Sequence, residues 1–212
     1  MAMTSNRRSR KRLATRQAIS DAATRLFFAH GFDRVTVDEI AEAADVGRMT
    51  VFNHFPRKED MFFDREQELH DLAFAAIRDR ESETSPIVAL GKLAHDLVDS
   101  PNPPLPLFDY THSFVATALA SETLKARARQ MRDHFVQALA AVLAEDREQA
   151  PGDPLAHLAA ALVATTWSVA FGRGHDEYDR TGDVREARRV FLSLIDRGTA
   201  GTIAALDGSV YG

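Results

Sequence analysis

Residues 36–58 read TVDEIAEAADVGRMTVFNHFPRK, and their pattern predicts two short helices joined by a tight turn. Thr36 followed three residues later by Glu39 matches a capping box, in which each side chain accepts a hydrogen bond from the backbone N–H of the other residue. Apolar residues then recur at helical spacing and give the first helix one buried stripe. Asp45 and Gly47 interrupt that spacing, and Asp tolerates the left-handed backbone that a sharp turn needs.

The second helix of this stretch is expected over residues 48–55, and Pro56 ends it because proline disfavours helical backbone in the residue before it. Val51 and Phe55 share one face of this helix, so its polar residues face elsewhere. A helix of about two turns is unstable alone and must be held by its neighbours. The pattern predicts a helix-turn-helix, in which the second helix enters the major groove of DNA. A plain helical hairpin with a polar outer face is the alternative interpretation.

The flanks extend the pattern over about residues 10–63. An apolar helical stripe that ends at Gly31 precedes the stretch, and a Lys58-Glu59 pair closes it. In order and spacing these blocks resemble the DNA-binding domain of the TetR family of bacterial transcription repressors. The residues that carry the resemblance are Ile19, Ala22, Ala23, Leu26, Phe27, Gly31, Phe32, Thr36, Val37, Ile40, Ala41, Thr50, Val51, Phe52, Asn53, His54, Phe55, Lys58 and Glu59.

The resemblance and the outward face of the second helix together give a set of expected DNA contacts. Three positions depart from the family pattern: Asp45 stands where a turn glycine is common, Gly47 where serine or threonine is frequent, and Phe52 where tyrosine is usual. The last change removes a hydroxyl that in the family tends to bond a DNA phosphate. The expected DNA-binding residues are Arg12, Thr36, Arg48, Met49, Thr50, Phe52, Asn53, His54 and Lys58.

Charge is distributed unevenly along the chain. Residues 1–58 hold eleven Lys and Arg against six Asp and Glu, a net charge of +5, while the remainder carries −10 and the whole chain −5. A basic N-terminal part on an acidic body is expected of a protein that meets DNA at one end. Residues 7–12, Arg-Arg-Ser-Arg-Lys-Arg, indicate an arm that contacts phosphate or the minor groove, with a disordered, solubilising tail as the alternative.

Composition places the chain among ordinary soluble globular proteins. Of its 212 residues, 45% are hydrophobic and 27% are charged. The chain contains no cysteine, which fits a reducing cytoplasm. The first seventeen residues have no apolar core and do not predict a secretory signal. We therefore expect a cytoplasmic protein.

The remaining sequence predicts helices and no strand, for a total of about nine helices in an all-α fold. Two domains are expected: an N-terminal arm with the helix-turn-helix over residues 1–57, and a helical domain over residues 58–212, which the resemblance makes the site of ligand binding and dimerisation. Four prolines within residues 100–106 exclude a helix there. The other helices are expected at about 11–30, 58–80, 87–99, 108–120, 121–148, 155–172 and 185–206, with a polar loop over 173–183 and a frayed end over 207–212.

Residues 155–172 carry no formal charge and approach the length of a membrane span. The segment is rich in alanine and has no aromatic belt, so a helix buried in protein is the better interpretation, and no membrane partner is expected. The resemblance implies that the last two long helices pair with their copies in a second subunit as a four-helix bundle; an internal core helix is the alternative. The small residues that would let another helix approach are Ala159, Ala160, Ala161 and Ala164.

No catalytic constellation is evident in the sequence. None of the eight histidines forms an H-E-x-x-H zinc motif, and the chain has no cysteine to supply thiolate ligands. His175-Asp176-Glu177 is a possible metal corner, but a solvated loop is the better interpretation. We therefore predict neither an enzyme nor a cofactor or metal site.

Aromatic and polar residues of the larger domain form a candidate ligand site. As a set they could line an apolar pocket with a few polar groups, the usual make-up of a small-molecule site, although each residue alone is better explained as core. In the TetR family that place holds an inducer. The candidates are Phe74, Phe108, Tyr110, His112, Met131, His134, Phe135, Trp167 and Phe171.

The sequence thus predicts a ligand-responsive repressor that binds a near-palindromic double-stranded DNA operator as a homodimer and leaves it when a small-molecule inducer binds. Two DNA-binding domains would occupy half-sites in successive major grooves, about 34–36 Å apart. One alternative is an all-helical enzyme or small-molecule carrier with an incidental hairpin. Another is a DNA-binding dimer that takes no ligand.

Overall fold

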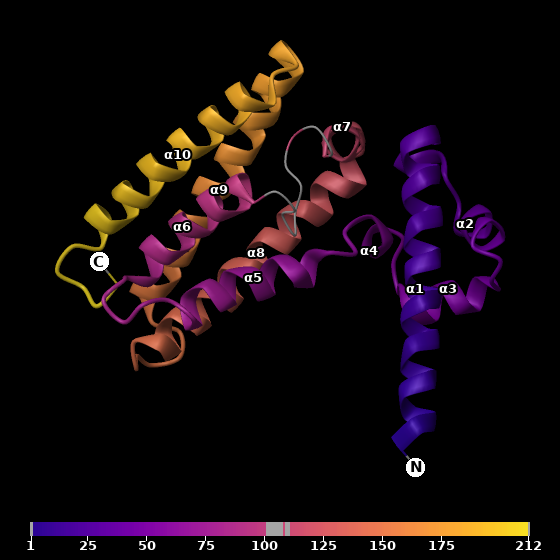
Figure 1. Cartoon of the computed structure of the whole chain (residues 1–212), viewed down its shortest axis with the longest axis horizontal. Helices are drawn as coiled ribbons and strands as arrows, with labels where there is room; N and C mark the ends of the chain where they lie inside the picture. Colours follow the sequence, from indigo (N-terminus) through magenta and orange to yellow (C-terminus); the bar gives the residue numbers. More distant parts are fainter. Residues whose placement is uncertain (1, 101–107, 109–110, 212) are drawn as a thin grey trace. The chain divides into compact units, whose positions relative to one another are not determined.

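The computed structural model describes residues 2–100, 108 and 111–211, with side chains from residue 8 onward. The described residues form ten α-helices and one 3₁₀ turn and contain no strand (Figure 1), which confirms the all-α fold. In chain order the elements are α1 (Ala2–His30), η1 (Phe32–Arg34), α2 (Val37–Ala43), α3 (Arg48–His54), α4 (Glu59–Phe62), α5 (Glu66–Arg78), α6 (Pro86–Asp99), α7 (His112–Ala120), α8 (Glu122–Asp146), α9 (Pro154–Thr181) and α10 (Val184–Ala205).

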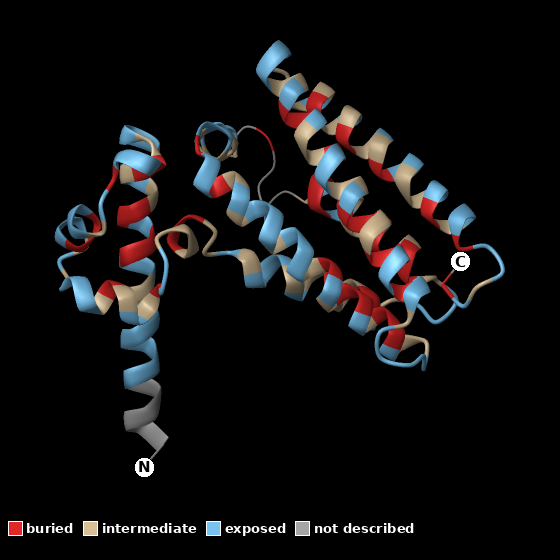
Figure 2. Cartoon of the chain, turned by 180° about the vertical axis from the view of Figure 1, so that it is seen from behind, coloured by how far each residue is buried: buried red, intermediate tan, exposed pale blue. Residues whose placement is uncertain are grey.

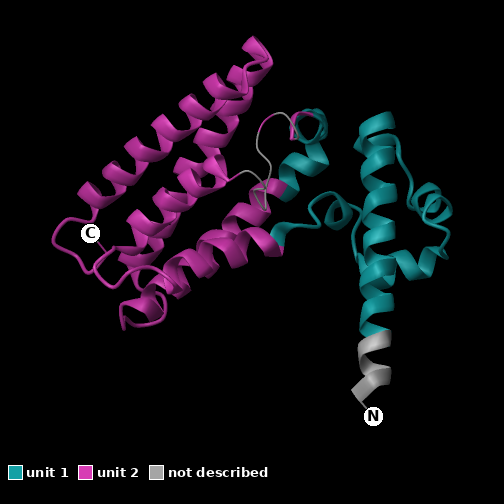
Figure 3. Ribbon diagram, viewed as in Figure 1, with its two compact units in different colours: residues 1–66, 113–127 teal, residues 67–112, 128–212 magenta. Residues whose placement is uncertain are grey.

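The chain is divided into two compact units (Figure 3). Unit 1 comprises residues 1–66 and 113–127, and unit 2 comprises residues 67–112 and 128–212. The sequence predicted a boundary between residues 57 and 58, and unit 1 extends beyond it. The physical reason is that α4 and the first turn of α8 add the buried side chains Met61, Phe62 and Leu124 to the core of unit 1.

Unit 1 is built around α1, whose buried positions are red in Figure 2. Its predicted apolar stripe faces inward, since Ile19, Ala23 and Phe27 have no exposed surface. Gly31 takes a φ of 80°, which glycine adopts without a Cβ penalty, and this turn brings the Phe32 ring to 5.0 Å from that of Phe27. The rest of the core consists of Val35, Ile40, Ala41, Val51, Phe55, Met61, Phe62 and Leu124.

The segment predicted as one linking helix is divided in two. α4 ends at Phe62, residues 63–65 form a turn, and α5 begins at Glu66. Adjacent side chains of a helix point about 100° apart. The turn instead lets both Phe62 and Phe63 contact Phe114, with ring centroids 4.4 and 5.8 Å from it.

Unit 2 contains two clusters of buried apolar side chains, and its long helices α9 and α10 lie side by side (Figure 1). Their contact is close, since a Cβ at Gly198 of α10 would lie 2.2 Å from Thr166 Cγ2 of α9. The first cluster includes Ala73, Ile77, Leu90, Leu139, Leu143, Ala159, Ala160, Val163, Ala164, Leu206 and Tyr211. The second consists of Ala94, Val98, Phe108, Ala170, Ala187, Phe191 and Ile195.

The helix α9 continues to Thr181, so the polar loop predicted over residues 173–183 is wrong. Phe108 covers this part of the helix: a Cβ at Gly174 would lie 2.3 Å from Phe108 Cε1, and His175 is buried. The helix ends where Gly182 takes a φ of 65°. The glycines and charges of this segment have the composition of a loop, but Gly174 and His175 are buried against Phe108 on one side of the helix.

The alanines of α9 pack within the chain, so the prediction that they face a second subunit is wrong. Ala159, Ala160 and Ala164 are buried in the first cluster of unit 2. Among the described helices α9 is the one long and apolar enough to span a membrane, by length and composition only, and 33% of its apolar window is buried in the protein. The predicted fraying of the C-terminus is also wrong, because Tyr211 is buried and its hydroxyl donates a 2.9 Å hydrogen bond to Asp153, the N-cap of α9.

Candidate nucleic-acid interface

The predicted capping box is present at the start of α2. Thr36 Oγ1 accepts a 3.3 Å hydrogen bond from Glu39 N, and Glu39 Oε2 accepts one of 2.7 Å from Thr36 N. Hydrogen bonds from Thr36 also hold the pKa of the Glu39 carboxyl below its ordinary value, because they stabilise the charged form. After α2, Asp45 has a φ of 52°, the left-handed conformation predicted for the turn, and Gly47 leads into α3.

The helix α3 is held by its inner face and exposes its outer one. Val51 and Phe55 are 0% and 1% exposed in the core of unit 1. On the outer side Arg48, Met49 and Asn53 are exposed, Met49 with 70% of its surface. The half-buried edges of α3 carry the other expected DNA contacts, Thr50, Phe52 and His54. The helix therefore presents one polar face to solvent, as a helix that enters the major groove must.

Arg48 forms an exposed ion pair with Asp38 of α2, with 2.6 Å between Nη1 and Oδ2. Its guanidinium carbon also lies 5.6 Å from the ring centroid of Phe52. Exposed ion pairs contribute about 0–1 kcal/mol, so this pair orients Arg48 without holding it strongly. A guanidinium at the first turn of α3 can offer two parallel hydrogen bonds to guanine O6 and N7.

Arg16 of α1 binds the C-terminal end of α3 through two contacts. Its Nη1 donates a 2.8 Å hydrogen bond to the carbonyl oxygen of His54, and its guanidinium carbon lies 4.0 Å from the ring centroid of Phe55. Carbonyls in the last turn of a helix lack a partner within that helix, and Arg16 supplies one. Sequence reasoning missed this residue, because no local pattern signals a contact across 38 positions.

Lys58 has a partner inside unit 1. Its Nζ donates a 2.5 Å hydrogen bond to the Phe32 carbonyl and lies 4.2 Å from the centroid of the Phe32 ring. Burial lowers the pKa of this ammonium, although Asp33, Glu59 and Glu39 oppose the shift. The expected phosphate contact of Lys58 stays a prediction, and it requires the ammonium to leave Phe32.

The basic arm predicted ahead of the first helix is itself helical, because α1 begins at Ala2. Arg8, Arg10, Lys11 and Arg12 are exposed on it. Their charges lie on the same helix as Arg16, which anchors α3. Unit 1 thus carries an exposed cationic segment on the element that supports the end of α3.

The described residues of the predicted ligand site are distributed over the two clusters of unit 2 and its surface. Phe74 and Phe135 pack on the first cluster, Phe108 and Phe171 belong with the second, and Trp167 contacts both. Met131 is half-buried, and the side chains of His112 and His134 are exposed. Tyr110 lies outside the described residues. Exposed His112 is 2.8 Å from Asp179 of α9. The set remains a prediction, and in this structure its phenylalanines and Trp167 pack in or against the buried clusters.

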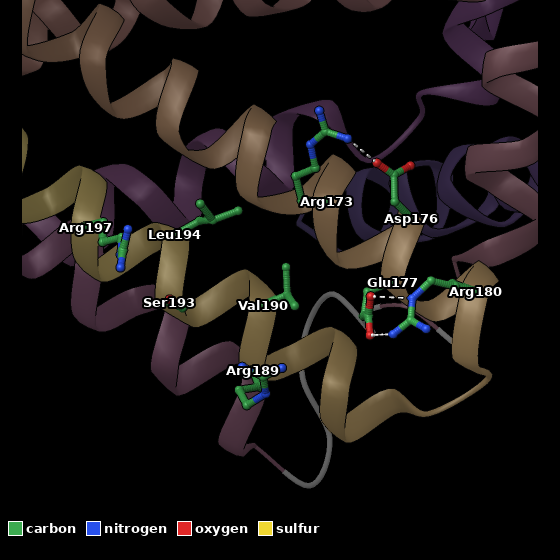
Figure 4. Close-up of a pocket in the computed structure, with 9 residues that line it drawn as sticks. All are labelled: Arg173, Asp176, Glu177, Arg180, Arg189, Val190, Ser193, Leu194 and Arg197. Atoms are coloured by element: carbon green, nitrogen blue, oxygen red, sulfur yellow. Dashed lines mark hydrogen bonds and ion pairs between the residues drawn. The ribbon is translucent and has the colours of Figure 1, made fainter.

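An open groove of about 450 Å³ lies between α9 and α10 of unit 2 (Figure 4). None of the predicted ligand-site residues that the structure describes lines it. Charged side chains of both signs surround two apolar ones. The lining residues are Arg173, Asp176, Glu177 and Arg180 of α9, with Arg189, Val190, Ser193, Leu194 and Arg197 of α10.

The residues of the possible metal corner have separate partners, and the solvated loop expected for them is wrong. Asp176 pairs with Arg173 at 2.9 Å and Glu177 with Arg180 at 2.5 Å (Figure 4). His175 is buried, with its Nε2 3.0 Å from the hydroxyl of Thr111. Within the part of the chain that the structure describes, no group of three His, Asp or Glu is placed to hold a metal ion.

Comparison with known proteins shows which family this chain resembles. A family model described as bacterial regulatory proteins, tetR family, matches residues 19–64. The transcriptional repressor LfrR of Mycolicibacterium smegmatis is 31% identical over 139 residues, which cover 65% of this chain and 70% of that protein. The chain belongs to the TetR family. MftR of Mycobacterium tuberculosis is 47% identical to this TetR-family protein over 53 residues, a match that spans 25% of this chain and 27% of MftR.

A solved structure extends the likeness over most of the chain. FadR of Thermus thermophilus, solved in complex with lauroyl-CoA, matches this TetR-family protein with a TM-score of 0.52 and 24% identity. The match covers 86% of this chain and 94% of FadR. At this identity the likeness shows a shared fold: an N-terminal helix-turn-helix followed by a larger helical part.

Proposed function

We propose that this TetR-family protein is a repressor that binds operator DNA through α3 and is released from it by a small molecule. The observation that supports DNA binding best is α3 itself, which buries Val51 and Phe55 and exposes Arg48, Met49 and Asn53. The net charge of +5 on residues 1–58 provides attraction to phosphate. LfrR is named as a transcriptional repressor, which favours a regulator over an enzyme or carrier. Such a protein acts in the cytoplasm.

The outer side chains of α3 have distinct roles in this proposal. Arg48 takes guanine O6 and N7 with two hydrogen bonds, and Asn53 pairs with adenine or a phosphate. Met49 meets a thymine methyl, and Thr50 bonds a phosphate. Phe52 packs on the sugar–phosphate edge without the hydroxyl bond of a tyrosine. A good two-bond base contact discriminates by about 1–3 kcal/mol, so Arg48 carries much of the sequence preference.

The exposed face of α9 is the proposed centre of a homodimer. Leu155, Leu158 and Val169 are 43%, 42% and 48% exposed in the single chain, and Leu162 continues their helical spacing. A stripe of exposed apolar side chains along a long helix marks a contact with a partner. Because dimers with two-fold symmetry present the same patch from both subunits, two copies of α9 can cover each other.

The groove of Figure 4 continues this face towards the end of α9. Arg173, Asp176 and Arg180 follow Val169 at intervals of four, three and four residues, so they lie on the same side of the helix. Leu194 adds an apolar side chain from α10. The mixture of charges lets an arginine of one copy meet a carboxylate of the other, which would fix the register of the pair.

The ligand is proposed to bind in unit 2. FadR, which has the same fold, was solved with lauroyl-CoA, so this fold can accommodate a small molecule. In this chain the aromatic residues around Phe108, Trp167 and Phe171 are the candidate contacts, and the ligand would have to displace part of their packing. The ligand can shift the protein away from the DNA-binding state only by as much as its affinities for the two states differ.

The salt dependence of binding to double-stranded DNA tests the proposal. The logarithm of the association constant should fall linearly with the logarithm of salt concentration, with a slope of about −0.9 per phosphate contact. Arg12→Ala should reduce the slope by about one unit, since one contact is lost. Arg78→Ala, which removes an exposed arginine of α5 in unit 2, is the matched control and should leave the slope unchanged. Undetectable or salt-independent duplex binding would favour the carrier or enzyme.

A further inference from the structure

The last residue of α3 lies among cations of α1. Arg16 bonds the carbonyl of His54 at 2.8 Å and covers the ring of Phe55 at 4.0 Å. Arg12, one helical turn earlier on α1, acts electrostatically on the imidazole of His54, as Arg16 does. His54 is half-buried at the edge of the proposed DNA-binding face. Both guanidinium groups disfavour a positive charge on this imidazole.

We propose that His54 takes up a proton when this protein binds DNA, so that mild acid strengthens the complex. The inference rests on the proposed DNA-binding function and adds a regulation of the same interface. In the free protein, burial first and then the positive charges of Arg12 and Arg16 hold the pKa of His54 below its ordinary value. The lowered pKa favours the neutral imidazole in the free protein.

DNA reverses the electrostatic environment of His54. A phosphate that pairs with Arg12 or approaches the end of α3 brings negative charge next to the imidazole. A nearby anion favours the protonated form and raises the pKa, whereas the two arginines alone oppose it. The same phosphates can accept a hydrogen bond from the imidazolium, because both ring nitrogens become donors. Binding and protonation therefore favour each other.

The sign of the pH dependence follows from the two pKa values. The pKa of His54 is higher in the complex than in the free protein, so the complex binds more protons between those two values. Affinity for DNA should rise as the pH falls through this window and stay constant above and below it. The change should be at most about tenfold per pH unit for each His54 that reaches DNA, because one proton is linked to each.

The direct test measures the association constant for a selected operator duplex between about pH 5.5 and 8.5 at fixed ionic strength. The parent protein should gain affinity towards acid, and His54→Gln should lose most of that gain. His30→Gln is the matched control, because His30 is an exposed histidine of the same unit at the last residue of α1. It should keep the slope of the parent. Equal slopes in the parent and in His54→Gln overturn the inference.

Calorimetry on the parent alone provides a second readout that does not depend on the variant. The binding enthalpy, measured in two buffers of different ionisation enthalpy near pH 6.5, counts the protons taken up. We expect net uptake at about that pH. Duplex binding without uptake overturns this inference and leaves the proposed function intact. A parent that binds no duplex at any pH overturns the proposed function and this inference together.

Discussion

Replacing Phe55 with alanine is expected to unfold unit 1 and abolish DNA binding. Phe55 is 1% exposed in the core of unit 1, and the guanidinium of Arg16 lies on its ring. Truncating a buried phenylalanine costs about 3–5 kcal/mol, because transfer free energy is lost and a cavity remains. A small folded unit has little more stability than that. Hydrogen exchange should show lost protection in α1, α2 and α3 with protection retained in α9 and α10.

Met49→Ala is the matched control for Phe55→Ala. Both residues lie on α3, but Met49 is 70% exposed. Its truncation should change stability by no more than about 0.5 kcal/mol and leave the exchange pattern of unit 1 intact. A Phe55→Ala protein with parental protection and parental duplex affinity would show that the inner and outer faces of α3 have been assigned wrongly.

Leu158→Glu is expected to convert the proposed dimer to a monomer. Leu158 is 42% exposed on the apolar stripe of α9, and two-fold symmetry would place the new carboxylate in the interface twice. An unpaired charge buried against apolar surface is strongly unfavourable. Sedimentation should show half the parental mass. Affinity for a two-half-site operator should fall by about 10²–10⁴, because the second half-site is no longer bound by a linked domain.

Leu69→Glu is the control for this substitution. Leu69 is a comparably exposed leucine, 44%, on α5 and outside the α9–α10 face. It should remain a dimer with parental operator affinity. If Leu158→Glu also sediments as a folded dimer, the interface lies elsewhere on the chain. The distinction does not depend on knowing the inducer.

The parts predicted correctly from the sequence are those in which interacting groups are close along the chain. The Thr36–Glu39 capping box and the left-handed backbone at Asp45 depend on residues a few positions apart. The inward faces of α1 and α3 follow from helical spacing, which is also local. These features were sufficient to predict the helix-turn-helix and its exposed side chains.

The missed features depend on contacts between distant residues. Arg16 reaches His54 across 38 positions, and Lys58 reaches Phe32 across 26. The ring of Phe108 covers Gly174 of α9, in the segment that the sequence predicted as a loop. Helical spacing could place Ala160 on a buried face, but it could not tell whether the covering helix belongs to the same chain or to a second one.

The candidate ligand site was the least predictable part of the chain. Its residues were selected by type and by expected helix, and such a choice cannot separate a core from a pocket. Phe74 and Phe135 pack with one buried cluster and Phe108 with the other, while His134 is exposed. A pocket requires a cavity, and cavities arise from the packing of several helices at once.

Binding-site selection on the parent and on Arg48→Ala tests the central claim most directly. The claim is that α3 reads operator DNA, with Arg48 contacting a base pair in each half-site. The parent should enrich one near-palindromic sequence from random duplexes. The Arg48 side chain is 57% exposed, so Arg48→Ala should stay folded. The variant should lose its preference at one base pair of each half-site, a discrimination of about 1–3 kcal/mol. Identical enriched sequences for the two proteins, or no enrichment by the parent, would contradict the account.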